Sequence, residues 1–268
     1  MQVASSLEAV LRRDRVIVLA GLIGVTVLAW AYMFYLAWDM QRSMSVDSME
    51  MGMSMASAQV RPWGTVDFAV MFIMWAVMMT AMMVPTAAPM ILTFATINRR
   101  RREQEQPFVP TGVFISGYLI VWSGFAATAT LVQWALHQGA LLSGMMGSTV
   151  PLLGGVILVA AGIFQWTPMK NACLKQCRTP LGFIMTEWRD GPKGALVMGT
   201  RHGGFCLGCC WSLMGLLFVA GIMNLLWVAV IAAYILVEKV MPAGHWLGRV
   251  AGLALIGWGA WTLVGALA

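Results

Sequence analysis

Seven apolar runs of membrane-spanning length constrain this chain most strongly. An α-helix needs about 20 apolar residues to cross the roughly 30 Å hydrocarbon core of a bilayer. Only 10% of the residues are charged, whereas a soluble domain carries about 25%. The sequence therefore predicts an all-α, polytopic transmembrane helix bundle. Its expected spans are Val16–Trp38, Val66–Ile97, Thr111–His137, Val150–Trp166, Phe205–Met223, Leu225–Val240 and Trp246–Leu267.

The boundary between the fifth and sixth spans depends on four residues. The apolar run from Cys206 to Glu238 is too long for a single crossing. Residues 221–224, Gly-Ile-Met-Asn, combine a glycine with a polar asparagine, which favours a tight helical hairpin. If the helix continues through them, the chain has six spans and its C-terminus changes side.

Basic residues predict the orientation of the bundle. Arg12, Arg13 and Arg15 precede the first span, and Arg99–Arg102 follow the second. Six more lysines and arginines lie in residues 167–204, and Glu238, Lys239 and Arg249 flank the last inward turn. By the positive-inside rule, the N-terminus and loop 167–204 are cytoplasmic and the methionine-rich loop 39–65 is extracytoplasmic. We expect one integral membrane domain, residues 1–268.

The net charge of +6 has a simple origin in this arrangement. The arginines cluster between apolar spans, so they indicate orientation in a bilayer rather than nucleic-acid binding. The lipid bilayer is the expected partner, and no nucleic-acid partner is predicted. The sequence has no glycine-rich phosphate loop and no Ser/His/Asp arrangement, so no catalytic residues are predicted.

All five cysteines fall between residues 173 and 210, together with one histidine. If a helix begins upstream of His202, that residue shares one face with Cys206 and with Cys209 or Cys210. Thiolates and an imidazole suit Cu(I) or Zn(II), and free thiols persist in the reducing cytoplasm. We predict a site for Cu(I), with zinc as the alternative, formed by Cys173, Cys177, His202, Cys206, Cys209 and Cys210. Redox thiols or packing cysteines are the competing interpretations, and His202 could also cap or hinge its helix.

Methionine is a second source of soft ligands, with 23 residues in the chain. Residues 40–55 of the predicted outer loop contain six of them. Thioethers bind Cu(I) without deprotonation, so this loop could collect copper outside the cytoplasm. The predicted ligands are Met49, Met51, Met53 and Met55. A flexible tether in which methionine is incidental is the alternative.

The second span carries methionines at helical spacing. Met71, Met74, Met78 and Met82 form one stripe, and we predict the last two as further metal ligands. Packing is the alternative, because methionine fills irregular helix contacts well. Prolines 85 and 89 predict a kinked backbone, which membranes tolerate where it is buried in protein or lines a cavity.

Three segments of the chain, residues 75–90, 165–183 and 194–227, carry a family resemblance. With their Cys-x3-Cys and His-x3-Cys-x2-Cys-Cys signatures, they resemble a bacterial family of predicted metal-binding integral membrane proteins of unknown function. The resemblance implies metal binding in a bacterial inner membrane but supplies no reaction, and it does not include the methionine-rich loop. The positions it points to are Cys173, Cys177, His202, Cys206, Cys209, Cys210, Met78, Met79, Met82, Met83, Pro85 and Pro89.

Three functions compete at this point. Soft ligands at both faces and along one helix favour a copper-handling membrane protein that acts as a carrier, an insertion factor or an accessory subunit. A partner protein or a larger membrane complex is expected with these roles. The paired cysteines also allow a membrane oxidoreductase, either a copper enzyme or a transmembrane thiol relay, so enzymatic activity stays open. The third function is a structural subunit of a membrane complex.

Overall fold

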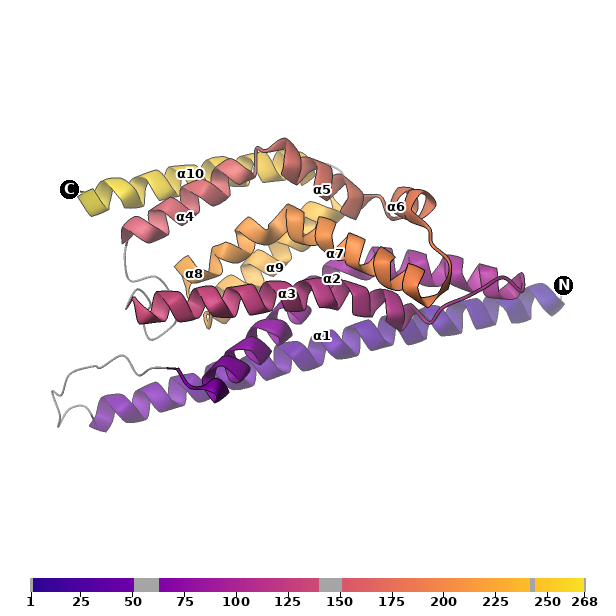
Figure 1. The fold of residues 1–268 in the computed structure, drawn as a ribbon, viewed down its shortest axis with the longest axis horizontal. Coiled ribbons are helices and arrows are strands. Elements are labelled where there is room, and N and C mark those ends of the chain that lie inside the picture. Colours follow the sequence, from indigo (N-terminus) through magenta and orange to yellow (C-terminus); the bar gives the residue numbers. More distant parts are fainter. Residues whose placement is uncertain (1, 51–62, 140–150, 242–243, 268) are drawn as a thin grey trace.

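The computed structural model describes residues 2–50, 63–139, 151–241 and 244–267, and these contain helices and no strand (Figure 1). The predicted all-α class is therefore confirmed for the described part of the chain. The helices are α1 (Gln2–Glu50), α2 (Thr65–Glu103), α3 (Thr111–Gln138), α4 (Pro151–Phe164), α5 (Pro168–Arg178), α6 (Pro180–Glu187), α7 (Gly191–Gly215), α8 (Leu217–Ala220), α9 (Leu225–Val240) and α10 (Gly244–Leu267).

Five helical segments are long and apolar enough to cross a membrane: Val16–Asp39, Thr65–Glu103, Thr111–Gln138, Gly191–Ala220 and Gly244–Leu267. A sixth crossing exists if α4 and α5, bent by 64° at their junction, form one span. Helix α9 has 16 residues and a length of about 24 Å, which is short of the roughly 30 Å hydrocarbon core. The described residues thus give five or six spans, and the predicted seven are not confirmed.

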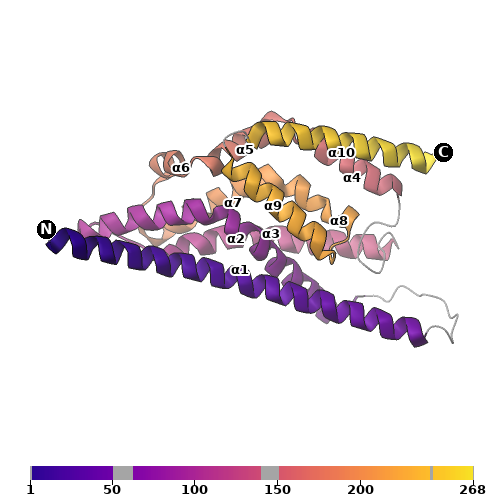
Figure 2. The ribbon, with the colours of Figure 1, turned by 180° about the vertical axis from the view of Figure 1, so that it is seen from behind.

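Successive long helices alternate in direction, as Figures 1 and 2 show from opposite sides. The N-terminal end of α1 and the C-terminal end of α10 lie at opposite ends of the molecule. The arginine-rich end of α2, helix α6 and the start of α7 lie at the same end as the start of α1. This alternation agrees with the predicted clustering of basic segments at one end, and the side of the membrane stays a prediction.

Both predicted loops contain helix. Helix α1 continues to Glu50, because no glycine or proline occurs between Trp38 and Gly52 to end it. Helices α5 and α6 each place a proline in the first turn, where its missing N–H costs nothing. The cysteines of the predicted loop 167–204 therefore lie on helices, and only short connections separate α5, α6 and α7.

The predicted break at residues 221–224 is confirmed. Helix α8 ends at Ala220, and Asn224 caps the start of α9. Gly221 has φ +92°, a left-handed backbone conformation that favours glycine because it has no Cβ. The chain turns back here, so α9 lies beside α7 in both views.

Glycines set the close approach of α3 and α7. A Cβ added at Gly117 or Gly199 would collide with the backbone of the opposite helix, which is the small-residue packing of membrane helices. The same kind of contact joins α4 to α10, where Gly162 and Gly252 face each other. The α3–α7 approach brings Tyr118 and Cys206 within hydrogen-bonding distance.

Candidate functional site

Helix α7 carries three of the five cysteines into the core. It begins at Gly191, upstream of His202, as the shared-face prediction requires. Cys206, Cys209 and Cys210 are buried. Cys177 on α5 lies near Cys206 and Cys209. The structure thus brings four of the predicted thiol ligands together.

Cys173 lies at the edge of this group. It is partly exposed. Its Sγ packs against Gly208 of α7, where an added Cβ would lie only 2.8 Å from the sulfur. It also interacts electrostatically with Cys209. Cys177, one helical turn away on α5, is partly exposed as well, so both thiols of α5 lie at the edge of the buried cysteines of α7.

Cys206 has the most polar surroundings of the five. Its Sγ is 3.0 Å from Lys239 Nζ and 3.1 Å from the Tyr118 hydroxyl. Lys239 is buried and also donates to Thr86 Oγ1 at 2.9 Å. In the described part of the chain no carboxylate pairs with Lys239. A buried ammonium requires compensation, and the available partner of opposite charge is a thiolate at Cys206.

The Tyr118 hydroxyl lies between two acceptors. Its oxygen is 3.0 Å from the carbonyl oxygen of Met83 and 3.1 Å from Cys206 Sγ. One hydroxyl proton cannot serve both. When the Cys206 thiol donates to Tyr118, Tyr118 donates to Met83; when Cys206 is a thiolate, Tyr118 can donate to the sulfur. The Met83 carbonyl keeps a donor in either case, because Thr86 Oγ1 lies 2.9 Å from it.

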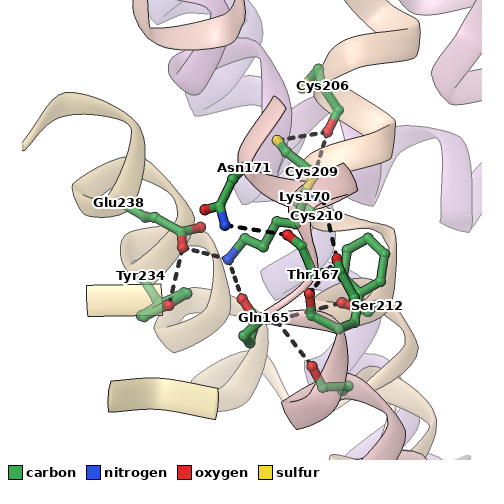
Figure 3. Close-up of polar contacts among 12 residues, drawn as sticks. Gln165, Thr167, Lys170, Asn171, Cys206, Cys209, Cys210, Ser212, Tyr234 and Glu238 are labelled. Carbon is green, nitrogen blue, oxygen red and sulfur yellow. Dashed lines mark hydrogen bonds and ion pairs between the residues drawn. The ribbon is translucent and has the colours of Figure 1, made fainter. Parts of the chain in front are cut away.

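Cys209 and Cys210 both turn back toward the preceding turn of α7. Their Sγ atoms donate to the carbonyl oxygen of Cys206 at 3.1 and 2.9 Å (Figure 3). Cys210 Sγ also lies 3.9 Å from the Sδ of Met83 on α2. We call Cys177, Cys206, Cys209, Cys210 and Met83 the sulfur cluster.

Across the described ranges, no three histidine, cysteine, aspartate or glutamate side chains form a metal-binding geometry. The Sγ atoms of Cys209 and Cys210 both donate to the carbonyl oxygen of Cys206. Rotation about χ1 between staggered positions would release each sulfur. The donor set itself, thiols and one thioether beside an ammonium, fits a soft monovalent metal.

His202 is buried one turn before Cys206. Its ring stacks on Phe114 and Tyr118, with centroid distances of 6.1 and 5.6 Å, and meets Phe183 edge-on. Its Nδ1 is buried and has no hydrogen-bond partner among the described residues. Such an atom is expensive to bury and retains its capacity to bind a ligand. Metal binding by His202 stays a prediction.

The predicted methionine ligands have different positions. Met78 and Met82 are buried in the core, and no contact joins either sulfur to the cysteines in the described residues. The neighbouring Met83 is the methionine that meets a thiol. The side chain of Met49 lies outside the described residues, as do Met51, Met53 and Met55, so the outer copper site stays a prediction.

A second buried polar network lies beside the sulfur cluster (Figure 3). Lys170 on α5 forms an ion pair with Glu238 on α9, and both side chains are only 1% exposed. Lys170 also donates to Gln165, and the Tyr234 hydroxyl lies 3.4 Å from Glu238 Oε1. Gln165 in turn reaches Ser212 on α7. We call these five residues the carboxylate network.

Glu238 and Lys239 were expected to flank the last inward turn, and they do lie in the last turn of α9, but both side chains are buried. They and Tyr118 were missed as parts of the site. The sequence did contain a signal for them. Charged residues within an apolar helix cost free energy in a membrane unless they are paired, and they commonly mark functional sites. Glu238 pairs with Lys170, 68 residues away, and Cys206 lies 33 residues from Lys239 and 88 from Tyr118, so no local pattern reveals these pairs.

These observations define an all-helical protein with several helices suited to crossing a membrane and with buried thiols around a lysine. Residues 72–262 match the family model of the PpoB2 copper chaperones. The match covers more than two thirds of the chain, so the protein belongs to this copper chaperone family, and its function is connected with copper. Neither the search of curated proteins nor the search of solved structures finds a match.

Proposed function

We propose that the protein is a membrane-embedded Cu(I) chaperone that holds its cargo at the sulfur cluster. The observation that carries the proposal is the position of Cys206 Sγ, 3.0 Å from Lys239 Nζ and 3.1 Å from the Tyr118 hydroxyl. Both groups stabilise negative charge on the sulfur. Thiolate is the form of cysteine that binds metals, and it selects soft ions such as Cu(I).

Charge balance favours a monovalent cargo. Two thiolates and one Cu(I) carry a net charge of −1, which the ammonium of Lys239 cancels. Burying an uncompensated charge is costly, so a neutral assembly is the stable one in this interior. Cys206 and Cys177 are the proposed primary ligands, with Cys209, Cys210, His202 and Met83 available to complete the site.

Cys173 suits the entry of cargo. It is partly exposed and lies one turn of α5 from Cys177. Copper can thus reach the buried thiols by exchange between neighbouring ligands. Met78 and Met82 are proposed as weaker sulfur ligands along α2, and the methionines at 49, 51, 53 and 55 as an outer collecting site.

The family and the helix composition also support a location. We propose a bacterial inner membrane, with residues 1–268 as one integral domain, the N-terminus in the cytoplasm and the sulfur cluster toward the cytoplasmic side. The charge distribution supports this orientation, because the arginine-rich end of α2 and the start of α7 lie together (Figure 1). Carrier and insertion roles both require a protein partner to receive the copper.

Copper stoichiometry and affinity test the proposal. Full-length protein in detergent is titrated with Cu(I) under anaerobic conditions in competition with a chromophoric chelator. We expect one high-affinity Cu(I) per chain, lost in Cys206→Ser and retained in Cys173→Ser. Equal binding by the wild type and by Cys206→Ser, with the same elution profile, would contradict the proposal, and so would wild-type protein that binds no Cu(I).

A thiol oxidoreductase is the second candidate, because Cys177 lies near Cys206. A disulfide between them would form as two thiols pass two electrons and two protons to a disulfide of a partner. This function predicts a mixed disulfide with that partner, trapped in Cys177→Ser. Thiols that stay reduced in cells while the protein binds copper would exclude it.

A further inference from the structure

A cavity of about 520 Å³ with basic side chains in its lining lies between α5 and the start of α10, apart from the sulfur cluster. Its lining contains two arginines, a lysine and a histidine, and no acidic residue. The lining residues are Asn171, Leu174, Lys175, Arg178, Thr179, His245 and Arg249. Such a lining favours an anion, and Asn171 and Thr179 add neutral donors.

The two outermost cations are not neutralised by carboxylates within the described residues. Lys175 is exposed on α5, and Arg249 is exposed on α10. The guanidinium of Arg249 lies over the rings of Trp166 and Trp246, at 5.9 and 5.4 Å from their centroids. These contacts hold Arg249 at the cavity while leaving its charge uncompensated.

The cavity has an apolar surface beside it. Trp166 and Trp246 are largely exposed, and Val250 and Leu253 follow on α10 with about three fifths of their surface exposed. Tryptophans at the ends of membrane helices lie at the level of the lipid headgroups. The start of α10 therefore places cations at headgroup depth and apolar side chains at the depth of the acyl chains.

We propose that this cavity is a binding site for an anionic phospholipid. Its phosphate group is recognised by Lys175 and Arg249, while Arg178 donates to the carbonyl oxygen of Met241 at the cavity wall, and its acyl chains lie along Val250 and Leu253. A soluble phosphate would satisfy the cations but would leave the adjoining apolar surface of α10 unused. A lipid satisfies both, and basic pockets between membrane helices on the cytoplasmic side are suited to such headgroups.

Lipid retention tests the site. Full-length protein is exchanged into mixed micelles that contain equal amounts of phosphatidylglycerol and phosphatidylcholine, and bound lipid is counted by native mass spectrometry. The test variant is the double substitution Lys175→Gln and Arg249→Gln. The control is Arg100→Gln with Lys193→Gln, which removes the same charge from exposed residues outside the cavity. Unchanged Cu(I) binding and elution show that each variant is folded.

We expect wild type and control to retain phosphatidylglycerol in preference to phosphatidylcholine. The test variant should lose about tenfold or more of this preference, since each basic residue contributes roughly 1 kcal/mol near an anionic surface. Equal loss in test variant and control would overturn the proposal, because it would reduce the effect to general surface charge. Displacement of the lipid by millimolar inorganic phosphate would also overturn it and assign the cavity to free phosphate.

Discussion

The carboxylate network and the sulfur cluster are built around neighbouring residues of α9, and they differ in the acidic group at their centre. In the carboxylate network, Lys170 and Tyr234 approach the carboxylate of Glu238. In the sulfur cluster, Lys239 and Tyr118 approach the thiol of Cys206. A lysine and a tyrosine thus surround an acidic group in both cases.

The difference lies in the acidic group. Glu238 supplies a counter-ion to Lys170 inside the protein, which makes that network complete without a ligand. Among the described residues, the polar partners of Lys239 are the thiol of Cys206 and the hydroxyl of Thr86, so its charge is fully balanced when the sulfur is ionised. Cys206 thus occupies the position that the carboxylate of Glu238 has in the other network. A metal ion bound by thiolates can complete the sulfur cluster.

The largest expected effect is on the carboxylate network. Glu238→Ala leaves the ammonium of Lys170 buried and unpaired, and we expect the free energy of unfolding to fall by about 3–5 kcal/mol. Circular dichroism during thermal unfolding in detergent measures the loss. The double variant Lys170→Met with Glu238→Leu should recover most of it, because no charge then remains. A single variant as stable as wild type would contradict the structural role of this pair.

Lys239→Met should lower the Cu(I) affinity while leaving the stability nearly unchanged, the opposite of Glu238→Ala. Removing this ammonium leaves no unpaired carboxylate, so stability should change far less than in Glu238→Ala. Cu(I) affinity should fall by about tenfold, or roughly 1.4 kcal/mol, because the charge near the metal–thiolate group is lost. Competition with a chromophoric chelator measures it, with the exposed Lys193→Met as control. A large loss of stability with unchanged Cu(I) affinity would contradict the proposed difference between the two networks.

Tyr118→Phe removes a hydroxyl that lies near both Met83 and Cys206. We expect a loss of about 1 kcal/mol in the free energy of unfolding, the usual contribution of one hydrogen bond. The Cu(I) affinity should also fall, as measured in the same competition assay. Unaltered Cu(I) affinity would show that the hydroxyl does not act on the thiolate.

Tyr234→Phe is the matched change in the carboxylate network and should have the smallest effect. Its hydroxyl is 3.4 Å from Glu238 Oε1, a long hydrogen bond, and Lys170 remains to pair the carboxylate. We expect a loss of about 0.5 kcal/mol or less and no change in Cu(I) affinity. A drop in affinity here would mean that the two networks act as one.

The sequence predicted the helices well, because apolar periodicity and length are local properties. Leu225–Val240 appears in the structure with the bounds expected of it, and Gly221 ends the preceding helix as its conformational freedom suggested. His202 was predicted to share one face with Cys206 and with Cys209 or Cys210, and the structure buries all four side chains.

What the sequence could not supply was pairing between helices. Residues 167–204 were expected to form a loop because they are polar, yet prolines 168 and 180 begin helices there. Lys239 was expected beside the last inward turn, and its burial depends on Cys206 and Thr86 on two other helices. Met78 and Met82 fitted a stripe, but Met83 is the methionine that meets a thiol, because helix rotation is set by packing.

X-ray absorption at the copper edge tests the central claim most directly. Full-length protein is loaded with one equivalent of Cu(I), and the atoms nearest to copper are identified in wild type, Cys206→Ser and Cys173→Ser. We predict sulfur as the dominant neighbour in the wild type and in Cys173→Ser, with copper lost or its sulfur count reduced in Cys206→Ser. Copper surrounded by nitrogen and oxygen, or the same sulfur environment in Cys206→Ser, would contradict a Cu(I) site at the sulfur cluster.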